Sequence, residues 1–401
     1  MNELCDQVAL RCDRARQVMK EKGFAALLIY GNNKINGALR YMTGYFPDRG
    51  GWIALGADRD RIHIFDAATL VLPAVGEPVL ALDPGQLLDR PSCIQRTTTS
   101  GFGESSAAAP TLDQALAAII RDTGGASRGA MIGVETWEKF PAPLYLKLKD
   151  LLPGVQLSRS TIVEDLMLIK SEWELVRFRR AGEIGDIGHA AFETALRERD
   201  GKSELELIRV AESEMRIADP VYEECSPISP SLICSGPSDD QLIMLHVPLG
   251  NKTVQLGDVI NWDICGRYCG YPIDTSRTRV LGKPTREQRR AYEASTQVAR
   301  TVREKAMPGV NVQALVDIAQ KTAGEMGFQL WDRFLGHGLG LDVHSRPDIG
   351  FESIDLKENM VFTIEPRIAL GGYLYGNEDM IHLTTNGAES LTNYPWDPFE
   401  V

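Results

Sequence analysis

The chain has 401 residues, with 43% hydrophobic and 24% charged side chains, a composition typical of a globular protein. This length exceeds one ordinary hydrophobic core and predicts two domains. The formal net charge is −12 and no dense run of Lys or Arg occurs, so we expect no nucleic-acid partner.

The N-terminal segment MNELCDQVALRCDRARQ is charged and amphipathic, and it lacks the apolar centre of a signal peptide. The sequence contains no run of about 18 or more apolar residues, so we expect no membrane span. Seven cysteines are scattered along the chain, an odd number that favours reduced thiols over a disulfide framework. We therefore expect a cytoplasmic protein.

The first part of the chain alternates predicted helices and strands. Helical spacing of apolar residues predicts a helix over 4–22 that stops at Gly23. FAALLIYG is a short apolar run typical of a buried strand, and strands are also predicted in GGWIALGA, RIHIF, PAVGEPVLAL and GAMIGVE. APLYLKLKDLLP predicts a helix between strands. This alternation predicts an α/β domain over residues 1–162.

The second part, over residues 163–401, has helices and strands in separate runs. Three helix starts carry a capping box, in which Ser or Thr is followed three residues later by Glu or Gln. These pairs are Ser171 with Glu174, Ser203 with Glu206, and Thr285 with Gln288. DVINWDI predicts a strand that pairs with TSRTRVL, and NMVFTIEPRI predicts one that pairs with EDMIHLTTNG. We therefore expect an α+β domain here, joined to the first by a linker within 160–170.

Asp263 and Asp274 bracket the stretch DICGRYCGYPID, whose turn-prone residues predict a strand–turn–strand. Facing strands can bring two acids into contact, but carboxylates repel each other unless a cation or a proton lies between them. Taken alone, the stretch favours solvated acids at the ends of a hairpin. Cys265 and Cys269 have no second cysteine pair at zinc-ligand spacing, so we interpret them as packing or turn residues.

Three further stretches place acids and histidines on strands and tight loops. GHGLGLDVHSRP holds His337 and His344 among glycines, which let a backbone approach a site closely. Glu365 lies among the apolar residues of VFTIEPRI, where burial is costly without a partner. Glu378 begins the next strand. Four carboxylates with an imidazole suit two divalent ions and favour Mn²⁺ or a related ion over thiolate-bound Zn²⁺.

These segments, in this order, resemble the superfamily of methionine aminopeptidases, prolidases, aminopeptidases P and creatinases, whose catalytic domain has the pita-bread fold. The resemblance covers about residues 165–395, including DTSRT at 274–278, and extends more loosely over the first 160 residues. It implies two divalent ions, with Mn²⁺ favoured and Co, Zn or Fe as alternatives. The implied ligands are Asp263, Asp274, His337, Glu365 and Glu378. Of these, Asp274 and Glu378 would bridge the ions.

The resemblance also implies the catalytic roles. A water held between the ions would attack the substrate, with Glu365 as the general base that later protonates the leaving nitrogen. His246, which precedes Asp263 by seventeen residues, and His344 would donate hydrogen bonds to the substrate carbonyl and the oxyanion. The alternative for His246 is a partly buried histidine bonded to backbone.

Three positions depart from the pattern of prolidases and aminopeptidases P. Gly376 stands where these enzymes commonly carry Arg, and Arg333 stands where many carry a further histidine. Arg367 follows Glu365-Pro366, where glycine is common. Arg367 would either anchor a substrate carboxylate or serve as an ordinary structural residue. The sequence thus supports the metal centre better than it supports specificity for proline.

The leading hypothesis is a dinuclear metal-dependent hydrolase of C–N bonds in small peptides, of the X-Pro aminopeptidase or dipeptidase type. The alternative is a non-peptidase member of the same fold, a creatinase-like hydrolase or lyase acting on a small amide, nitrogenous metabolite or osmolyte. A non-catalytic binding protein fits less well, because such relatives lose ligands that this chain keeps. The resemblance further implies a homodimer.

Overall fold

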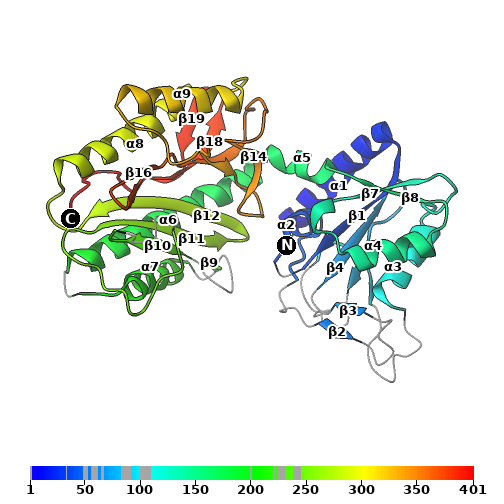
Figure 1. The fold of residues 1–401 in the computed structure, drawn as a ribbon. Helices are drawn as coiled ribbons and strands as arrows, with labels where there is room; N and C mark the ends of the chain where they lie inside the picture. Colours follow the sequence, from blue (N-terminus) through cyan, green and yellow to red (C-terminus); the bar gives the residue numbers. More distant parts are fainter. Residues whose placement is uncertain are drawn as a thin grey trace. The chain divides into compact units, whose positions relative to one another are not determined.

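The computed structural model describes residues 2–32, 34–47, 53–55, 62–64, 67–82, 92–99, 110–198, 201–219, 222–223, 231–237 and 245–401. The chain divides into two units, Met1–Met167 and Leu168–Val401 (Figure 1). The predicted boundary between residues 162 and 163 falls at the start of helix α5 (Ile162–Leu168). Most of the predicted strand segment GGWIALGA lies outside the described residues.

The first unit is built around a six-stranded sheet in the order β6-β5-β4-β1-β7-β8. Its strands are β1 (Phe24–Gly31), β4 (Ala68–Pro73), β5 (Val79–Leu82), β6 (Arg96–Thr99), β7 (Met131–Val134) and β8 (Gln156–Arg159). Strand β1 pairs antiparallel with β4 and parallel with β7, so the sheet is mixed. A separate ribbon joins β2 (Ile53–Leu55) to β3 (Ile62–Ile64).

The helices of the first unit are α1 (Asn2–Lys22), α2 (Gly37–Thr43), α3 (Leu112–Asp122), α4 (Ala142–Leu151) and α5. Leu116 and Ile120 of α3 and Leu148 of α4 are buried in one apolar cluster with β1 and β7. The predicted α/β character of this unit is confirmed. Sequence reasoning missed β4, although all six of its residues are buried.

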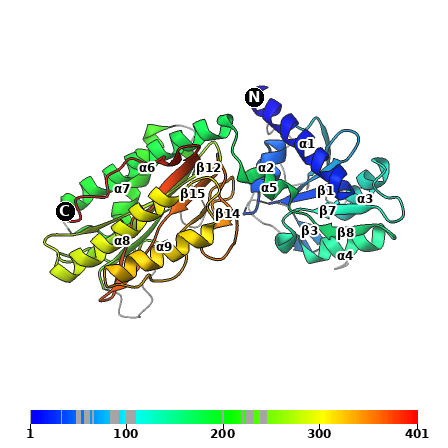
Figure 2. The same cartoon turned by 90° about the horizontal axis from the view of Figure 1, so that it is seen from above.

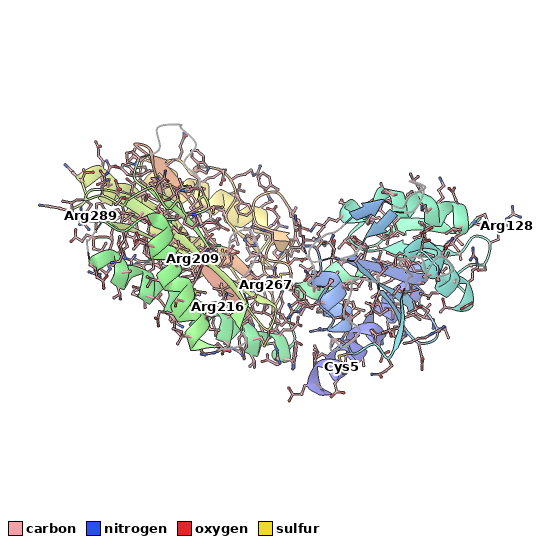
Figure 3. All side chains as sticks on the ribbon, turned by 90° about the horizontal axis from the view of Figure 1, so that it is seen from below. Cys5, Arg128, Arg209, Arg216, Arg267 and Arg289 are labelled. Carbon is pink, nitrogen blue, oxygen red and sulfur yellow. A yellow bond between two sulfur atoms is a disulfide. The ribbon has the colours of Figure 1, made fainter. Side chains whose placement is uncertain are left out.

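One expectation about the cysteines is wrong. Cys5 of α1, labelled in Figure 3, forms a disulfide with Cys93, which is 88 residues away. That separation is why no local pattern predicts the pair. Cys12 and Cys234 are buried outside any disulfide.

The second unit has two pairs of helices, α6 (Glu172–Arg197) with α7 (Glu204–Ala218), and α8 (Arg286–Lys305) with α9 (Val312–Glu325). Figures 1 and 2 show α6 and α7 on one side of the strands and α8 and α9 on the other. The capping boxes predicted for α6, α7 and α8 are all present. Within the described residues, no helix combines the length and the apolar character that crossing a bilayer requires.

Between the helix pairs lie antiparallel sheets. In the first, β10 (Leu232–Ser235), β11 (Val259–Tyr268) and β12 (Tyr271–Val280) follow in order, and β9 (Tyr222–Glu223) also pairs with β11. The second has the order β14 (Ser345–Asp348), β13 (His337–Gly338), β15 (Val361–Ile364), β18 (Asp379–Thr384) and β19 (Gly387–Ser390). A short ribbon joins β16 (Ile368–Leu370) to β17 (Tyr373–Tyr375). Both predicted strand pairs, β11 with β12 and β15 with β18, are confirmed.

Two features connect the sheets at the point where the acids gather. Ser276 of β12 and Glu378 exchange backbone hydrogen bonds of 3.3 and 2.9 Å. The fully buried Arg277 donates to the carbonyl of Glu378 at 2.7 Å and to the Asp379 carboxylate at 2.8 Å. These bonds hold the start of β18 against β12, so segments about 100 residues apart meet.

Candidate metal centre

The hairpin of β11 and β12 brings three ligand-type side chains onto one face. Cys265 lies directly opposite Asp274, and Asp263 lies opposite Ser276. Because side chains alternate along a strand, Asp263 and Cys265 share a face, and Asp274 joins them from across the pair. Ligand atoms of Asp263, Cys265 and Asp274 all lie within 4.8 Å of one another. The two acids are therefore diagonal neighbours, and the Cys265 thiol lies directly across from Asp274 on the same face.

A second group joins the hairpin to the other sheet. Ligand atoms of Asp274, His337 and Glu378 lie within 4.8 Å of one another, and each residue is 5% exposed or less. The His337 Nε2 atom is 3.2 Å from Asp274 Oδ2 and 3.7 Å from Glu365 Oε1. Asp274 belongs to both groups. The five residues proposed from the sequence as ligands thus come from β12, β11, β13 and the ends of β15 and β18.

The conformation of the loop that carries His337 depends on a glycine and on a hydrogen bond from strand β11. A Cβ atom at Gly338 would lie 1.9 Å from the carbonyl oxygen of Arg346, so this position cannot hold a side chain without a backbone shift. Arg267 of β11, labelled in Figure 3, donates to the carbonyl of Leu341 at 2.6 Å. The His337 Nδ1 atom lies 3.1 Å from the carbonyl of Gly338, which leaves Nε2 facing the acids.

The electrostatics of the cluster favour a cation. Burial, then repulsion from Asp274, raises the pKa of Asp263 well above its ordinary value. Burial, then the charges of Glu365 and Asp274, does the same for the pKa of Glu378. Burial alone would lower the pKa of His337, but the hydrogen bond and charge of Asp274 raise it to about 9. Without a metal ion, bound protons and the nearby Arg367 guanidinium therefore offset the negative charge of these carboxylates.

Glu365 and His344 lie at the more open side of the cluster. Thr363 Oγ1 donates to Glu365 Oε1 at 3.1 Å, which fixes the orientation of a carboxylate that is 14% exposed. The rings of His337 and His344 have centroids 4.4 Å apart, and His344 is exposed. His344 can therefore reach a molecule that binds against the cluster.

The structure does not bring His246 to the cluster. Its Nε2 atom lies 2.9 Å from Glu204 Oε2, at the start of α7. His246 pairs with Ile233, which pairs in turn with Trp262, so His246 shares the Trp262 face and not the Asp263 face. The catalytic role expected for His246 stays a prediction.

Arg367 lies inside the cluster and is 7% exposed. Its Nη2 atom is 3.4 Å from Glu365 Oε2 and 3.6 Å from Glu378 Oε2, and its Nη1 atom donates to Asn261 Oδ1 at 3.3 Å. A Cβ atom at Gly376 would lie 2.7 Å from Arg367 Cδ, so the glycine makes room for this side chain. In this arrangement Arg367 faces the acids of the protein itself.

Sequence reasoning missed Asn261 and Thr363, which support the cluster, and it interpreted Cys265 only as a packing or turn residue. Asn261 donates to Thr278 Oγ1 at 2.6 Å and to the carbonyl of Gly376 at 3.0 Å, and it accepts from Arg367. Asn261 and Cys265 each lie two residues from Asp263, and Thr363 lies two residues before Glu365. The period of two along a strand is the signal that would have placed them on the same face. By contrast, Arg333 is outside the cluster, where it donates to Gln313 at 2.7 Å.

Comparison with known proteins connects this arrangement to a family. The model of metallopeptidase family M24 matches residues 176–385, and that of the creatinase/prolidase N-terminal domain matches residues 11–167. The chain is 32% identical to the Xaa-Pro dipeptidase of Pyrococcus horikoshii over 237 residues, which are 58% of this chain and 64% of that protein. This match spans less than two thirds of the relative's length. The methionine aminopeptidase of Aquifex aeolicus is 30% identical over 216 residues, 50% of this chain and 82% of that protein.

Solved structures agree over the whole chain. A prolidase from Thermococcus sibiricus has a TM-score of 0.78 and 25% identity, with 98% of both chains covered. The dipeptidase PepE from Mycobacterium ulcerans has a TM-score of 0.79 at 24% identity, with 99% and 98% covered, and shows the same fold. The expected α/β N-terminal domain and α+β pita-bread catalytic domain are thereby confirmed. The chain belongs to metallopeptidase family M24 and carries an N-terminal domain of the creatinase/prolidase type.

Proposed function

We propose that this protein is a metal-dependent hydrolase of C–N bonds in small peptides. The observation that supports it is the cluster of buried acids around His337, in which Asp274 is shared between two groups of ligand-type atoms. The proposed ligands are Asp263, Asp274, His337, Glu365 and Glu378. The shared position of Asp274 supports a pair of bridged ions over a single ion.

The residues present fit divalent ions. Among the described residues, Glu378 Oε2 is a buried oxygen without a hydrogen-bond partner. The Arg367 guanidinium lies 3.6 Å from this oxygen, beyond hydrogen-bond distance, so a directly bound metal ion would supply the partner that the oxygen lacks. Carboxylate oxygens with one imidazole suit Mn²⁺, and Co, Zn or Fe ions are alternatives. We propose Mn²⁺ because the five proposed ligands are four carboxylates and one imidazole.

Divalent ions, when bound, would lower the pKa of a water molecule and polarise the substrate carbonyl. Side chains of the protein would transfer the proton and donate a hydrogen bond to the substrate. Glu365, oriented by Thr363, would accept the proton of the attacking water and pass it to the leaving nitrogen. His344, exposed beside His337, would donate a hydrogen bond to the carbonyl oxygen as negative charge develops there.

The similarity to dipeptidases favours peptides as the substrate class over small metabolites. The matched proteins include Xaa-Pro dipeptidases at 32% and 33% identity and a probable dipeptidase PepE of Mycobacterium tuberculosis over 84% of this chain. We therefore propose Xaa-Pro dipeptides as substrates. A homodimer and a cytoplasmic location are proposed with it, and light scattering tests the first of these.

A substrate panel tests the proposal. The Mn²⁺-loaded protein should cleave Xaa-Pro dipeptides, and Asp274→Asn should lose at least about a hundredfold in rate because a bridging ligand is gone. Asp317→Asn, an exposed acid on α9, is the matched control and should keep full activity. Turnover of small amides or betaines without any cleavage of dipeptides would refute the proposal and favour the creatinase-like alternative.

A further inference from the structure

The thiol of Cys265 lies in one group of ligand-type atoms with the two acids of the hairpin. Its Sγ atom lies 3.7 Å from Asp263 Oδ1 and, with Asp274, forms a group whose ligand atoms are all within 4.8 Å. Strand periodicity fixes this geometry, because Cys265 is two residues after Asp263 and directly opposite Asp274. The sulfur is therefore directed to the same point as the two carboxylates.

A second observation indicates that a cation belongs at this point. The Asp263 side chain is 8% exposed, and among the described residues the Cys265 thiol is its single hydrogen-bond donor. A thiol is a weak donor and satisfies a buried carboxylate poorly. On the other side of Asp274, Glu378 Oε2 is buried without a hydrogen-bond partner among the residues described. At both ends of the cluster a buried carboxylate thus lacks a strong hydrogen-bond donor, and the Arg367 guanidinium, 3.6 Å from Glu378 Oε2, balances the negative charge only in part.

We propose that Cys265 is a sulfur ligand of the ion held by Asp263 and Asp274. This inference rests on the proposed metal centre and adds a ligand to it. The thiol proton leaves to solvent when the ion binds, since the thiolate is the form that ligates metals. A soft sulfur ligand shifts the preference of this position from Mn²⁺ toward Zn²⁺, Co²⁺ or Fe²⁺.

Cys269 offers a matched control in the same hairpin. It lies at the turn, with a φ of 51°, and is not part of either group of ligand atoms. Both cysteines are of intermediate exposure, so a difference between them reports position and not access to reagents. Cys265→Ser and Cys269→Ser therefore remove one thiol each from neighbouring sites with different predicted roles.

Cobalt provides a readout that is independent of activity. Titration of the metal-free wild-type protein with Co²⁺ should produce a sulfur-to-cobalt charge-transfer band in the near ultraviolet. The band should persist in Cys269→Ser and disappear in Cys265→Ser, which should still bind cobalt through its carboxylates. Competition between Zn²⁺ and Mn²⁺ should show that Cys265→Ser loses roughly tenfold or more of the preference for Zn²⁺.

Alkylation supplies a second test that needs no variant. Bound Co²⁺ or Zn²⁺ should slow the reaction of Cys265 with iodoacetamide and leave Cys269 unchanged, as peptide mass spectrometry would measure. Bound cobalt without the band, or a band that survives Cys265→Ser, would overturn the sulfur ligand while the metal centre stands. A wild-type protein that binds no cobalt would overturn both.

Discussion

Replacing Arg367 by methionine is predicted to weaken the metal-free protein and to tighten metal binding at the same time. Its guanidinium lies 3.4 Å from Glu365 and 3.6 Å from Glu378, and all three side chains are buried or nearly so. One charge pair at this separation is worth about 5 kcal/mol at an effective dielectric constant of about 20. Desolvation of the guanidinium offsets much of this, and breaking a buried pair typically costs about 3 to 5 kcal/mol net.

We expect urea unfolding of metal-free Arg367→Met to show a free energy of unfolding lower by about 3 kcal/mol or more. Calorimetry should show Mn²⁺ binding at least about tenfold tighter, a change of about 1.4 kcal/mol in binding free energy. The reason is that the guanidinium no longer competes with the metal ion for the carboxylates. Arg333→Met is the control, since Arg333 is exposed and bonded to Gln313. It should change neither quantity.

An Arg367→Met protein with wild-type stability and wild-type Mn²⁺ affinity would contradict the electrostatic argument. If such a protein also raised the KM for dipeptides and left metal binding unchanged, Arg367 would be the substrate-carboxylate anchor that the sequence offered as one alternative.

Four further predictions concern the fold and the metal. Gly338→Ala should destabilise the protein by about 1 to 3 kcal/mol, because its Cβ would lie 1.9 Å from a backbone oxygen. Gly324→Ala in α9, where a Cβ meets open space, should instead stabilise by about 0.5 to 1 kcal/mol, and urea unfolding measures both. Burial holds the pKa of His189 well below 6.5, so below about pH 6.5 the unfolded chain binds a proton that the folded chain does not bind. The free energy of unfolding should therefore fall by about 1.4 kcal/mol for each pH unit below about pH 6.5. His189→Gln should flatten this slope. Chelation should lower the melting temperature of the metal-loaded protein, since an ion at 100 times its Kd stabilises by about 2.7 kcal/mol.

The sequence predicted the parts of the fold that local signals specify. Ser171 with Glu174 marks the start of α6 because a capping box acts within one turn. The β11–β12 hairpin followed from its apolar strands and the turn between them. Strand β4 was missed although Pro73 marks its end, and the Cys5–Cys93 disulfide was missed because its partners are far apart.

For the candidate site, the spacing of residues along the sequence identified the ligand-type residues better than it identified the contacts that each side chain makes. The position of Arg367 depends on Asn261 and Gly376, which are distant in sequence and meet it only after the sheets pack. His246 has the expected distance from Asp263 along the chain, but its pairing with β10 turns its side chain to the other face. Cys265 is different, because it lies two residues after Asp263 in one strand, and this spacing alone predicts that the two side chains share a face.

Metal analysis tests the central claim, that the acids around His337 hold divalent ions, most directly. Wild-type protein loaded with Mn²⁺ and dialysed should retain close to two ions per chain, Asp274→Asn should retain fewer, and Asp317→Asn should match the wild type. Cleavage of Xaa-Pro dipeptides should rise and fall with that occupancy. Wild-type protein that retains no divalent ion after loading, or that cleaves dipeptides equally well after chelation, would contradict the account.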